Sequence, residues 1–593
     1  MARDRPLLSS RSSSELSRGL AEEDALLTGQ PTTRSGPRTW NFWREIGLFV
    51  WAVIATAAVI VLAVIYQKAQ DSSNGAPPLS GKRNLVFMVS DGMGPTSLSL
   101  TRSFMQYTEG APFNKQLILD KHFIGQSRTR SASSLITDSA AGATAFSCAL
   151  KSYNGAISVL PNHQPCGTVL EAAKKAGYMT GLVVTTRITD ATPATFASHV
   201  HMRQEEDLIA QQMVGDHPLG RVVDLIFGGG KCHFLPNSSL SSCRADDKDI
   251  VALAQKNGFN YISDRQGFND LKGGKSIKLP MLGLFADGDI PFEIDRRNED
   301  DHYPSLHEMA ETALTALSEA TRDSKKGFFL MIEGSRIDHA GHFNDPAAQV
   351  HEVLAYDKTM TSVLDFLERD STQGVMVSTS DHETGGLAAA RQLHASYPQY
   401  LWYPGPLANA SHSAERLDLN YKAFLLSHPS APKATQRQFV EDSITSGLGI
   451  MDASDEEIDA LVAQPEISLY LFADMISRRS QTGWSTHGHS AADVNIYSSD
   501  PVLAKALVGN HENTEVGDFL REFLDVDVES VTKELREKGI KMMGMEEGES
   551  WMGRLPEEGE RIDGGDHLKT YEGEFRRRGL EGGVHVGCGC GMH

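Results

Sequence analysis

Positive charge is scarce in this 593-residue chain. Its 56 Lys and Arg residues stand against 77 Asp and Glu, which gives a formal net charge of −21. Because nucleic acids are bound mainly through Lys and Arg contacts to phosphate, this balance excludes a nucleic acid as the main partner. The same deficit opposes the binding of any anion unless bound metal cations invert the local sign. No fixed-period repeat stands out, and the length allows one large domain or two smaller ones.

One segment lacks charge altogether. Residues 46–66, IGLFVWAVIATAAVIVLAVIY, are 21 residues without a charged side chain. At about 1.5 Å per residue they can span a hydrocarbon core of about 30 Å. Trp43 and Tyr66 stand where interfacial anchors would. Because the preceding 45 residues are too long for the n-region of a cleaved signal peptide, we predict one transmembrane helix over residues 46–66.

The charges flanking this segment predict its orientation. Seven Arg residues precede it, whereas only Lys68 follows it before Lys82. The positive-inside rule then predicts a type II protein with a cytosolic, disordered tail over residues 1–45 and its bulk across the membrane. Residues 67–82 are interpreted as a polar lumenal stalk because they are rich in turn formers.

A lumenal compartment agrees with the cysteines and with two sequons. The short spacings predict two disulfides, with free buried thiols as the alternative: Cys148 with Cys166, and Cys232 with Cys243. NSS at Asn237 and NAS at Asn409 are candidate glycosylation sites. Residues 548–593 are Gly-rich and charged without an apolar stripe, so they are predicted to form a flexible tail. Their CGCGMH end is a weak candidate for a soft metal.

Apolar runs alternate with helical patterns over residues 83–547, the predicted catalytic domain. Runs at 85–89, 180–186, 327–334 and 374–382 are typical of buried strands, and the last three each follow a helical segment. This order predicts an α/β fold with a mainly parallel central sheet and helices on both faces.

Ligand-type side chains stand just after these runs. In an open α/β sheet the carboxyl ends of the strands meet at one edge, where ligands bind. Taken singly, each residue is more simply a turn, a cap or a satisfied histidine. Together, several carboxylates at one edge would repel one another unless cations joined them. Imidazole with carboxylate suits zinc, and oxygen-only sets suit magnesium. The residues are Asp91, Asp190, Thr192, Arg203, Glu333, Asp338, His339, His342, Asp381 and His382, with His487 and His489 before a later apolar stretch.

The stretch LITDSAAGATA, residues 135–145, has two interpretations. Asp138 and Ser139 are favoured N-caps before an Ala-rich helix, which predicts a helix over residues 141–149. The alternative is that Ser139 is a nucleophile at that helix end.

Six blocks resemble the alkaline phosphatase family in order and spacing over residues 84–513. They are VSDGMG, TDSAAGATA, DATPATFASHV with the following Arg, EGSRIDHAGH, SDHETGG and THGHSAADV. The single N-terminal span and GNHENTEVG at 509–517 make the chain similar to the fungal vacuolar (repressible) branch of that family. The resemblance implies a phosphoric monoester hydrolase with two zinc ions and one magnesium ion.

The resemblance also implies residue roles. Ser139 forms a phosphoserine intermediate, Asp138 supports it, and Arg203 clamps phosphate oxygens. The first zinc ligands are Asp338, His342 and His489, the second are Asp91, Asp381 and His382, and the magnesium ligands are Asp91, Thr192 and Glu333. His489 is preferred to His487 because HSAADV aligns better with the family block. Asp190 and His339 stand behind the ligands: His339 departs from the Lys of the well-known bacterial form, whereas Asp190 matches it.

The family resemblance further implies broad specificity for small phosphomonoesters, with phosphopeptides as a second class, and a homodimer. EEDALL at 22–27 and DRPLL at 4–8 resemble dileucine signals that sorting adaptors read on the way to a vacuole-like organelle. The C-terminal tail is then a candidate propeptide. The alternatives are a phosphodiesterase or sulfatase-like relative, and a catalytically dead membrane adaptor.

Overall fold

The computed structural model describes residues 38–74, 81–395, 400–539 and 550–557, and the chain divides into two compact units, residues 1–78 and 79–593. The first unit contains one described helix, α2 (Arg38–Asn74), which is long and apolar enough to cross a membrane over Phe42–Val59. The helix exceeds the predicted span at both ends. Residues 38–45 are therefore helical rather than disordered, and 67–74 are helical rather than turn-rich, because the sequence holds no Pro or Gly between Arg38 and Asn74 except Gly47.

The second unit is built on a ten-stranded sheet in the order β12-β2-β11-β8-β1-β7-β3-β4-β6-β5. β1 pairs in parallel with β7 and β8, and β3 pairs in parallel with β7 and β4, so the centre is parallel as predicted. β11 runs antiparallel to both β8 and β2. The strands are β1 (Arg83–Val89), β2 (Phe123–Arg128), β3 (Met179–Arg187), β4 (Leu225–Gly229), β5 (Asn260–Ile262), β6 (Met281–Leu284), β7 (Phe328–Glu333), β8 (Gln373–Thr379), β11 (Val494–Ser498) and β12 (Gly509–Glu512).

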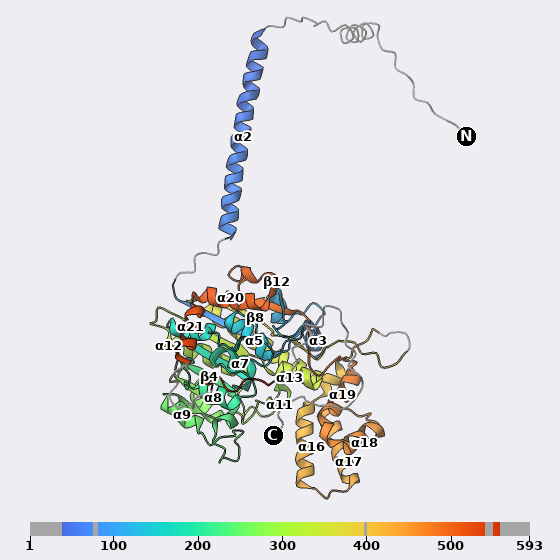
Figure 1. Ribbon diagram of the computed structural model, residues 1–593. Helices are drawn as coiled ribbons and strands as arrows, with labels where there is room; N and C mark the ends of the chain where they lie inside the picture. Colours follow the sequence, from blue (N-terminus) through green and yellow to red (C-terminus); the bar gives the residue numbers. More distant parts are fainter. Residues whose placement is uncertain (1–37, 75–80, 396–399, 540–549, 558–593) are drawn as a thin grey trace, which may run out of the picture. The chain divides into compact units, whose positions relative to one another are not determined.

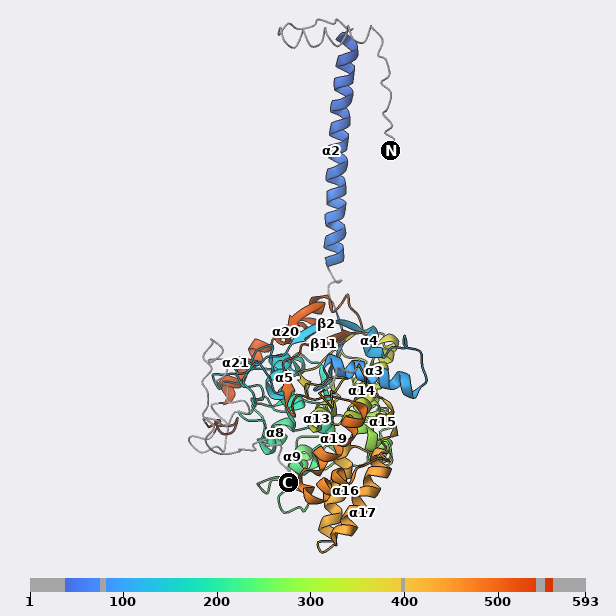
Figure 2. The ribbon, with the colours of Figure 1, turned by 90° about the vertical axis from the view of Figure 1, so that its right-hand side faces the viewer.

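Helices cover both faces of this sheet, as the alternation of apolar runs and helical patterns predicts (Figures 1 and 2). One face is covered by α5 (Ser139–Cys148), α6 (Val169–Lys175), α7 (Ala191–Ala197), α8 (Glu206–Met213), α9 (Ile250–Lys256) and α20 (Asn513–Leu524). The other face is covered by α3 (Pro95–Thr108), α10 (Arg265–Asp270), α12 (Leu306–Ala320) and α14 (Pro346–Arg369). The short helices α4 (Ile118–Lys121) and α11 (Glu293–Arg296) pack against α14.

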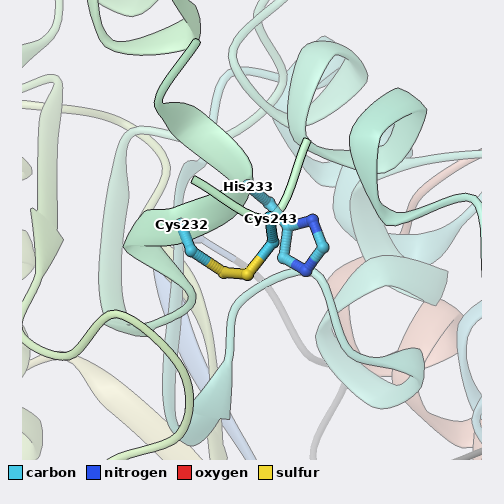
Figure 3. A group of neighbouring side chains, drawn as sticks. All are labelled: Cys232, His233 and Cys243. Carbon is cyan, nitrogen blue, oxygen red and sulfur yellow. A yellow bond between two sulfur atoms is a disulfide. The ribbon is translucent and has the colours of Figure 1, made fainter. Parts of the chain in front are cut away.

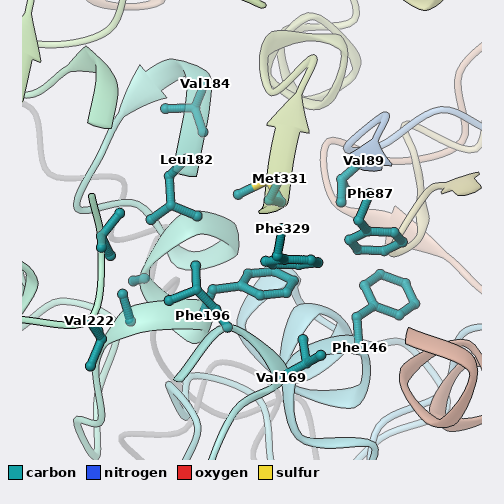
Figure 4. Packing of buried hydrophobic residues seen from close by; sticks show 14 of the residues in the cluster. Phe87, Val89, Phe146, Val169, Leu182, Val184, Phe196, Val222, Phe329 and Met331 are labelled. Atoms are coloured by element: carbon teal, nitrogen blue, oxygen red, sulfur yellow. The ribbon is translucent and has the colours of Figure 1, made fainter. Parts of the chain in front are cut away.

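The two faces are packed by alternate residues of the same strand. Leu85, Phe87 and Val89 of β1 point to one core cluster, whereas Val86 and Met88 point to the other. Figure 4 shows the first cluster, where the Phe87 ring lies edge-on to Phe146 at a centroid distance of 5.4 Å. Because β1 is buried on both faces, its apolar run is continuous rather than alternating.

A helical insertion follows the short strand β9 (Glu383–Thr384) and precedes its partner β10 (His489–Ser490). Its helices gather at one end of the unit in both views and share a separate core cluster with α14 (Figures 1 and 2). They are α15 (Gly405–Asn409), α16 (Ala414–Ser427), α17 (Lys433–Ser443), α18 (Asp455–Ala463) and α19 (Ser468–Ser480).

Both predicted disulfides are present, Cys148–Cys166 and Cys232–Cys243. Figure 3 shows the Cys232–Cys243 bond with the His233 ring beside it; its sulfur atoms bond each other and are not free metal ligands. Asn237 and Asn409 are exposed, so both sequons are accessible, and their glycosylation stays a prediction.

The start of the predicted C-terminal tail is not a free chain. After α21 (Val528–Lys538), residues 550–557 pack against other parts of the second unit, and Trp551 and Met552 are only 8% and 9% exposed. The prediction of a flexible tail from residue 548 is therefore wrong for 550–557, because two adjacent apolar side chains in a polar stretch are enough to anchor it. Residues 558–593, including the CGCGMH end and the remainder of the candidate propeptide, lie outside the described residues.

Candidate active site

The Asp138-Ser139 pair lies at the N-terminus of α5. Asp138 is the N-cap residue, and its Oδ1 accepts a hydrogen bond from the N–H of Ala141 at 3.0 Å. The helix begins at Ser139, two residues before the predicted start, and Ala149 ends it in a left-handed conformation. The Oγ of Ser139 lies 3.1 Å from Nε2 of His382, which follows β8. A nucleophile here also faces the positive end of a helix dipole, which favours a bound anion.

The small residues behind Ser139 allow this close approach. A Cβ atom at Gly142 would lie 2.9 Å from Cβ of Asp381, closer than two side chains tolerate. Gly92, at φ +77°, is similarly confined, because a Cβ there would lie 2.5 Å from Cα of Asp338. The backbone of α5 at Gly142 therefore packs directly against Asp381, and the turn after β1 at Gly92 packs directly against Asp338.

The first predicted zinc group comes together from two elements. Asp338 and His342 are one turn apart on α13 (Arg336–Phe343), and His489 begins β10. Nε2 of His342 lies 3.2 Å from Oδ2 of Asp338, and Nε2 of His489 lies 3.1 Å from Nε2 of His342 and 3.6 Å from Oδ1 of Asp338. Ligands held about 2.0–2.1 Å from a tetrahedral zinc ion lie about 3.3 Å apart, so the two imidazole nitrogens and the Asp338 carboxylate have a spacing that suits such an ion.

Of the two candidate histidines in THGHS, the fold brings His489 to this group. Its side chain is nearly buried, and burial and the nearby His382 lower the pKa of His489 to about 3, which keeps its ring neutral as a metal ligand must be. His487 is exposed, and its Nδ1 lies 2.9 Å from the carbonyl oxygen of His342.

The second predicted zinc group is fully enclosed. Asp91 follows β1, and Asp381 and His382 follow β8, so two adjacent parallel strands deliver all three. Nε2 of His382 lies 3.1 Å from Oδ2 of Asp381 and 3.5 Å from Oδ1 of Asp91. Oδ1 of Asp91 and Oδ2 of Asp381 are buried, and among the described residues no donor other than the His382 ring lies near them. Buried carboxylate oxygens with so few donors are costly, and a cation among them would satisfy both.

Glu333 and Thr192 complete the arrangement around Asp91. Thr192, in α7, donates a hydrogen bond through Oγ1 to Oδ2 of Asp91 at 3.3 Å. Glu333 ends β7, and its buried Oε2 has no hydrogen-bond partner. Burial and the negative charges of Asp190 and Asp381 raise the pKa of Glu333 to about 8. Burial and the neighbouring carboxylates likewise raise the pKa of Asp91 well above its ordinary value. An oxygen-coordinated cation would relieve this repulsion.

Arg203 joins the nucleophile end of the site to Asp190. Its Nη1 lies 3.3 Å from Oδ2 of Asp138 and its Nη2 lies 3.0 Å from Oδ1 of Asp190. Burial opposes the charge of Asp190, but Arg187 and Arg203 lower its pKa below the usual range. His339 lies behind it, with Nε2 3.8 Å from Oδ2 of Asp190.

One residue that connects the two predicted zinc groups was not predicted from the sequence. Thr384 donates a hydrogen bond through Oγ1 to Oδ1 of Asp338. Oγ1 of Thr384 also lies 3.2 Å from Nδ1 of His382. Thr384 sits two positions after His382 in SDHETGG, in the short strand that pairs with His489. Its position inside that block was the available signal.

A second buried group resembles a metal site by composition only. Glu171, His199 and His217 place their ligand atoms within 4.8 Å of one another. Nδ1 of His217, however, accepts a hydrogen bond from the N–H of Leu219 at 3.2 Å. Its proton must then be on Nε2, the atom that faces Glu171, so that nitrogen has no lone pair for a metal.

The chain is similar to known proteins over most of its length. Residues 82–526 match the family model described as alkaline phosphatase. Over 537 residues the chain is 50% identical to the repressible alkaline phosphatase of Saccharomyces cerevisiae, covering 87% of this chain and 94% of that protein. It is 46% identical over 531 residues to an alkaline phosphatase of Schizosaccharomyces pombe, covering 88% and 95%. The crystal structure of Thermus thermophilus alkaline phosphatase superposes with a TM-score of 0.63 at 27% identity, covering 78% of this chain and 97% of that one.

Proposed function

The chain belongs to the alkaline phosphatase family and is a hydrolase of that family, and from this premise we propose that it hydrolyses phosphomonoesters through a phosphoserine at Ser139. The observation that carries the proposal is the position of Ser139. Its hydroxyl lies at the start of α5, 3.1 Å from Nε2 of His382 in one ligand group, and Arg203 pairs with the preceding residue, Asp138. A phosphoryl group there would meet a helix N-terminus and a guanidinium together.

The donor sets fit two zinc ions and one magnesium ion. Asp338, His342 and His489 would hold one zinc, and Asp91, Asp381 and His382 the other. Asp91, Thr192 and Glu333 would hold magnesium, which suits their oxygen-only chemistry. Bound there, such ions stabilise an alkoxide and the developing charge on phosphate, and they activate water. Because Nε2 of His382 is assigned to metal, His382 is not the general base for Ser139.

The chain's own residues then have distinct tasks in two steps. Arg203 would orient two phosphate oxygens while Asp138 holds the start of α5 and the arginine together. In the first step Oγ of Ser139 gives its proton to water and bonds to phosphorus as the bond to the ester oxygen breaks, and that oxygen takes up a proton and leaves as the alcohol. In the second step water loses a proton and attacks phosphorus, the bond to Oγ breaks, Oγ regains a proton, and phosphate leaves.

The proposed groups all act on the phosphoryl group, which supports broad specificity for small phosphomonoesters, with phosphopeptides as a further class. The apolar helix α2 supports anchoring as a type II membrane protein, and the dileucine-like segments support sorting to the membrane of a vacuole-like organelle with the catalytic unit in its lumen. A homodimer and glycosylation at Asn237 and Asn409 are proposed on the family resemblance and on the sequons.

The test is hydrolysis by the purified full-length protein in detergent. We expect activity on a generic phosphomonoester that rises with pH, disappears after chelation, and returns when zinc and magnesium are added back together. A matched phosphodiester and a sulfate ester should be hydrolysed far more slowly. Preference for either of these substrates would favour the phosphodiesterase or sulfatase-like alternative, and metal binding without any hydrolysis would favour a dead adaptor.

A further inference from the structure

Residues 550–557, here called the C-terminal strap, are bonded along the segment that carries Arg203. That segment, residues 199–205, is called the Arg203 loop. The N–H of His201 donates to the carbonyl oxygen of Met552 at 3.0 Å, and the N–H of Arg554 donates to Oε1 of Glu205 at 3.2 Å. The strap therefore meets the loop on both sides of Arg203.

Gln212 of α8 fixes the start of the same loop to the strap. Its Nε2 donates to the carbonyl oxygens of His199 and Trp551, both at 3.1 Å. Its Oε1 accepts a hydrogen bond from the N–H of His199 at 2.7 Å. One amide thus satisfies both backbone groups of His199 and ties them to Trp551.

The Trp551 ring covers a buried charge pair beneath the loop. Its centroid lies 5.8 Å from the ring of His199 and 5.7 Å from that of His217, edge to face in both cases. Nδ1 of His199 lies 3.0 Å from the carbonyl oxygen of Ser158, and Nε2 lies 2.8 Å from Oε1 of Glu171. With both nitrogens facing acceptors, His199 is an imidazolium paired with the Glu171 carboxylate.

The His199–Glu171 ion pair depends on the Trp551 ring, which shields it from solvent. The side chains of His199, His217 and Glu171 are fully buried, and Trp551 forms part of the wall between them and solvent. Because a buried ion pair is stable only when its hydrogen bonds are complete and its geometry is held, loss of the ring would let the start of the loop shift.

Hydrogen bonds connect Arg203 in this loop to Asp138, the residue before Ser139. The N–H of Arg203 donates to the carbonyl oxygen of Gly155 at 2.8 Å, and the N–H of Gly155 donates to Oδ2 of Asp138 at 2.9 Å. Oδ2 of Asp138 also lies 3.3 Å from Nη1 of Arg203, and Asp138 caps the helix that begins at Ser139. A shift of the loop would therefore move the guanidinium relative to Ser139.

We propose that Trp551 is a positioning residue: through the C-terminal strap it holds the Arg203 loop so that the guanidinium grips phosphate. This inference rests on the proposed phosphate-binding role of Arg203. It assigns a task in the reaction to a segment outside residues 82–526, the part of the chain that matches the family model.

The experiment compares full-length, metal-loaded variants by kcat, KM for a phosphomonoester, and Ki for inorganic phosphate. We expect Trp551→Ala to raise Ki and KM by about fivefold or more, because small misplacements of a positioning group cost about this much or more. Trp551→Phe should recover most of the loss. The matched control is Leu535→Ala, which removes a buried side chain from the same core cluster, in a helix bonded to Gly167 through Thr532. It should lower Tm and leave Ki within about twofold.

A double-mutant cycle decides whether Trp551 acts through Arg203. In an Arg203→Ala background, adding Trp551→Ala should change Ki by less than about twofold. An unchanged Ki in Trp551→Ala, or the same fold-change in both backgrounds, overturns the strap proposal. A wild-type Ki in Arg203→Ala alone overturns the role of Arg203 instead. If Trp551→Ala does not fold, Glu205→Ala, which removes the acceptor for the N–H of Arg554, replaces it under the same criteria.

Discussion

The Oγ of Ser139 and Nε2 of His382 lie 3.1 Å apart, although 243 positions separate them in the chain. Ser139 begins α5, and His382 follows β8, the neighbour of β1 in the sheet. Gly142 lets α5 approach Asp381 closely enough for the contact. The position of the hydroxyl is therefore fixed by the packing of a helix against the carboxyl end of the sheet.

A covalent intermediate at Ser139 predicts a trappable phosphoenzyme. Quenching with acid during turnover of a ³²P-labelled monoester should leave label on the peptide that contains Ser139. Ser139→Ala should remove the label and lower kcat by about a thousandfold or more. Ser147→Ala, in the same helix, should keep the label. Equal labelling of the Ser139→Ala protein would contradict the covalent route.

Gly142→Ala has two opposing effects, because it raises the helix propensity of α5 but brings a new Cβ atom against Asp381. In an exposed helix this change stabilises by about 1 kcal/mol, but here the new Cβ would lie 2.9 Å from Cβ of Asp381. We expect the steric effect to dominate, with kcat/KM reduced at least about tenfold and zinc bound more weakly. Metal content and kinetics measured together will check this.

The control for that prediction is Gly288→Ala, because a Cβ at Gly288 would meet no atom within 4 Å. Its zinc content and kcat/KM should match those of the unmodified protein. A Gly142→Ala protein with unchanged zinc content and higher Tm would show that α5 and Asp381 can move apart freely.

The charge of the Glu333 carboxylate should determine how tightly the protein binds magnesium. Glu333→Gln removes one negative charge from the oxygen-only set, so the magnesium concentration that half-restores activity after chelation should rise about 10- to 100-fold. Titration of the chelated enzyme measures this. Glu352→Gln is the matched control, since burial also raises the pKa of Glu352 to about 7 but its Oε1 accepts from the N–H of Glu293. If this magnesium concentration rose equally in both variants, Glu333 would not be a magnesium ligand.

The His199–Glu171 pair predicts a pH dependence of stability. Burial opposes the charge of His199, but Glu171 outweighs it and raises the pKa of His199 above 6.5. A raised histidine pKa stabilises the folded state below the unfolded-state pKa, near 6.5, and this contribution is lost as pH rises through the folded-state pKa. The Tm difference between wild type and His199→Gln should therefore shrink as pH rises from about 6 to 9.

Thermal unfolding across that range is the measurement, with His428→Gln, an exposed histidine, as the control. Its Tm difference from wild type should stay near zero at every pH. A constant gap for His199→Gln would show that His199 is neutral throughout.

The parallel centre of the fold was predictable because its strands are buried on both faces. Leu85 to Val89 is a continuous apolar run, and the candidate ligand residues Asp91 and Asp381 follow two such strands. Because parallel neighbours end at the same edge, the convergence of these residues follows from their positions in the sequence. The N-cap role of Asp138 was likewise readable from residue type alone.

The edge of the sheet was not predictable in the same way. β2 and β12 carry polar residues and only short alternating patterns, since they lie on one side of the antiparallel strand β11. The choice of His489 over His487 rested on the family resemblance, because the pairing of β10 with β9, which joins residues 105 positions apart in the case of Thr384 and His489, leaves no local signal in the sequence. Trp551 was hidden by its polar surroundings, because one anchored ring leaves no periodic signal.

The C-terminal strap also decides where this protein tolerates being cut or fused. A recombinant fragment ended at residue 526, where the match to the family model stops, would lack both α21 and the strap. It would retain every candidate zinc and magnesium ligand of the site, yet the Glu171–His199 pair would lose the contact with Trp551 that covers it. Affinity tags and reporter domains should be fused after Glu557, so that the Trp551 ring keeps its contacts with His199 and His217.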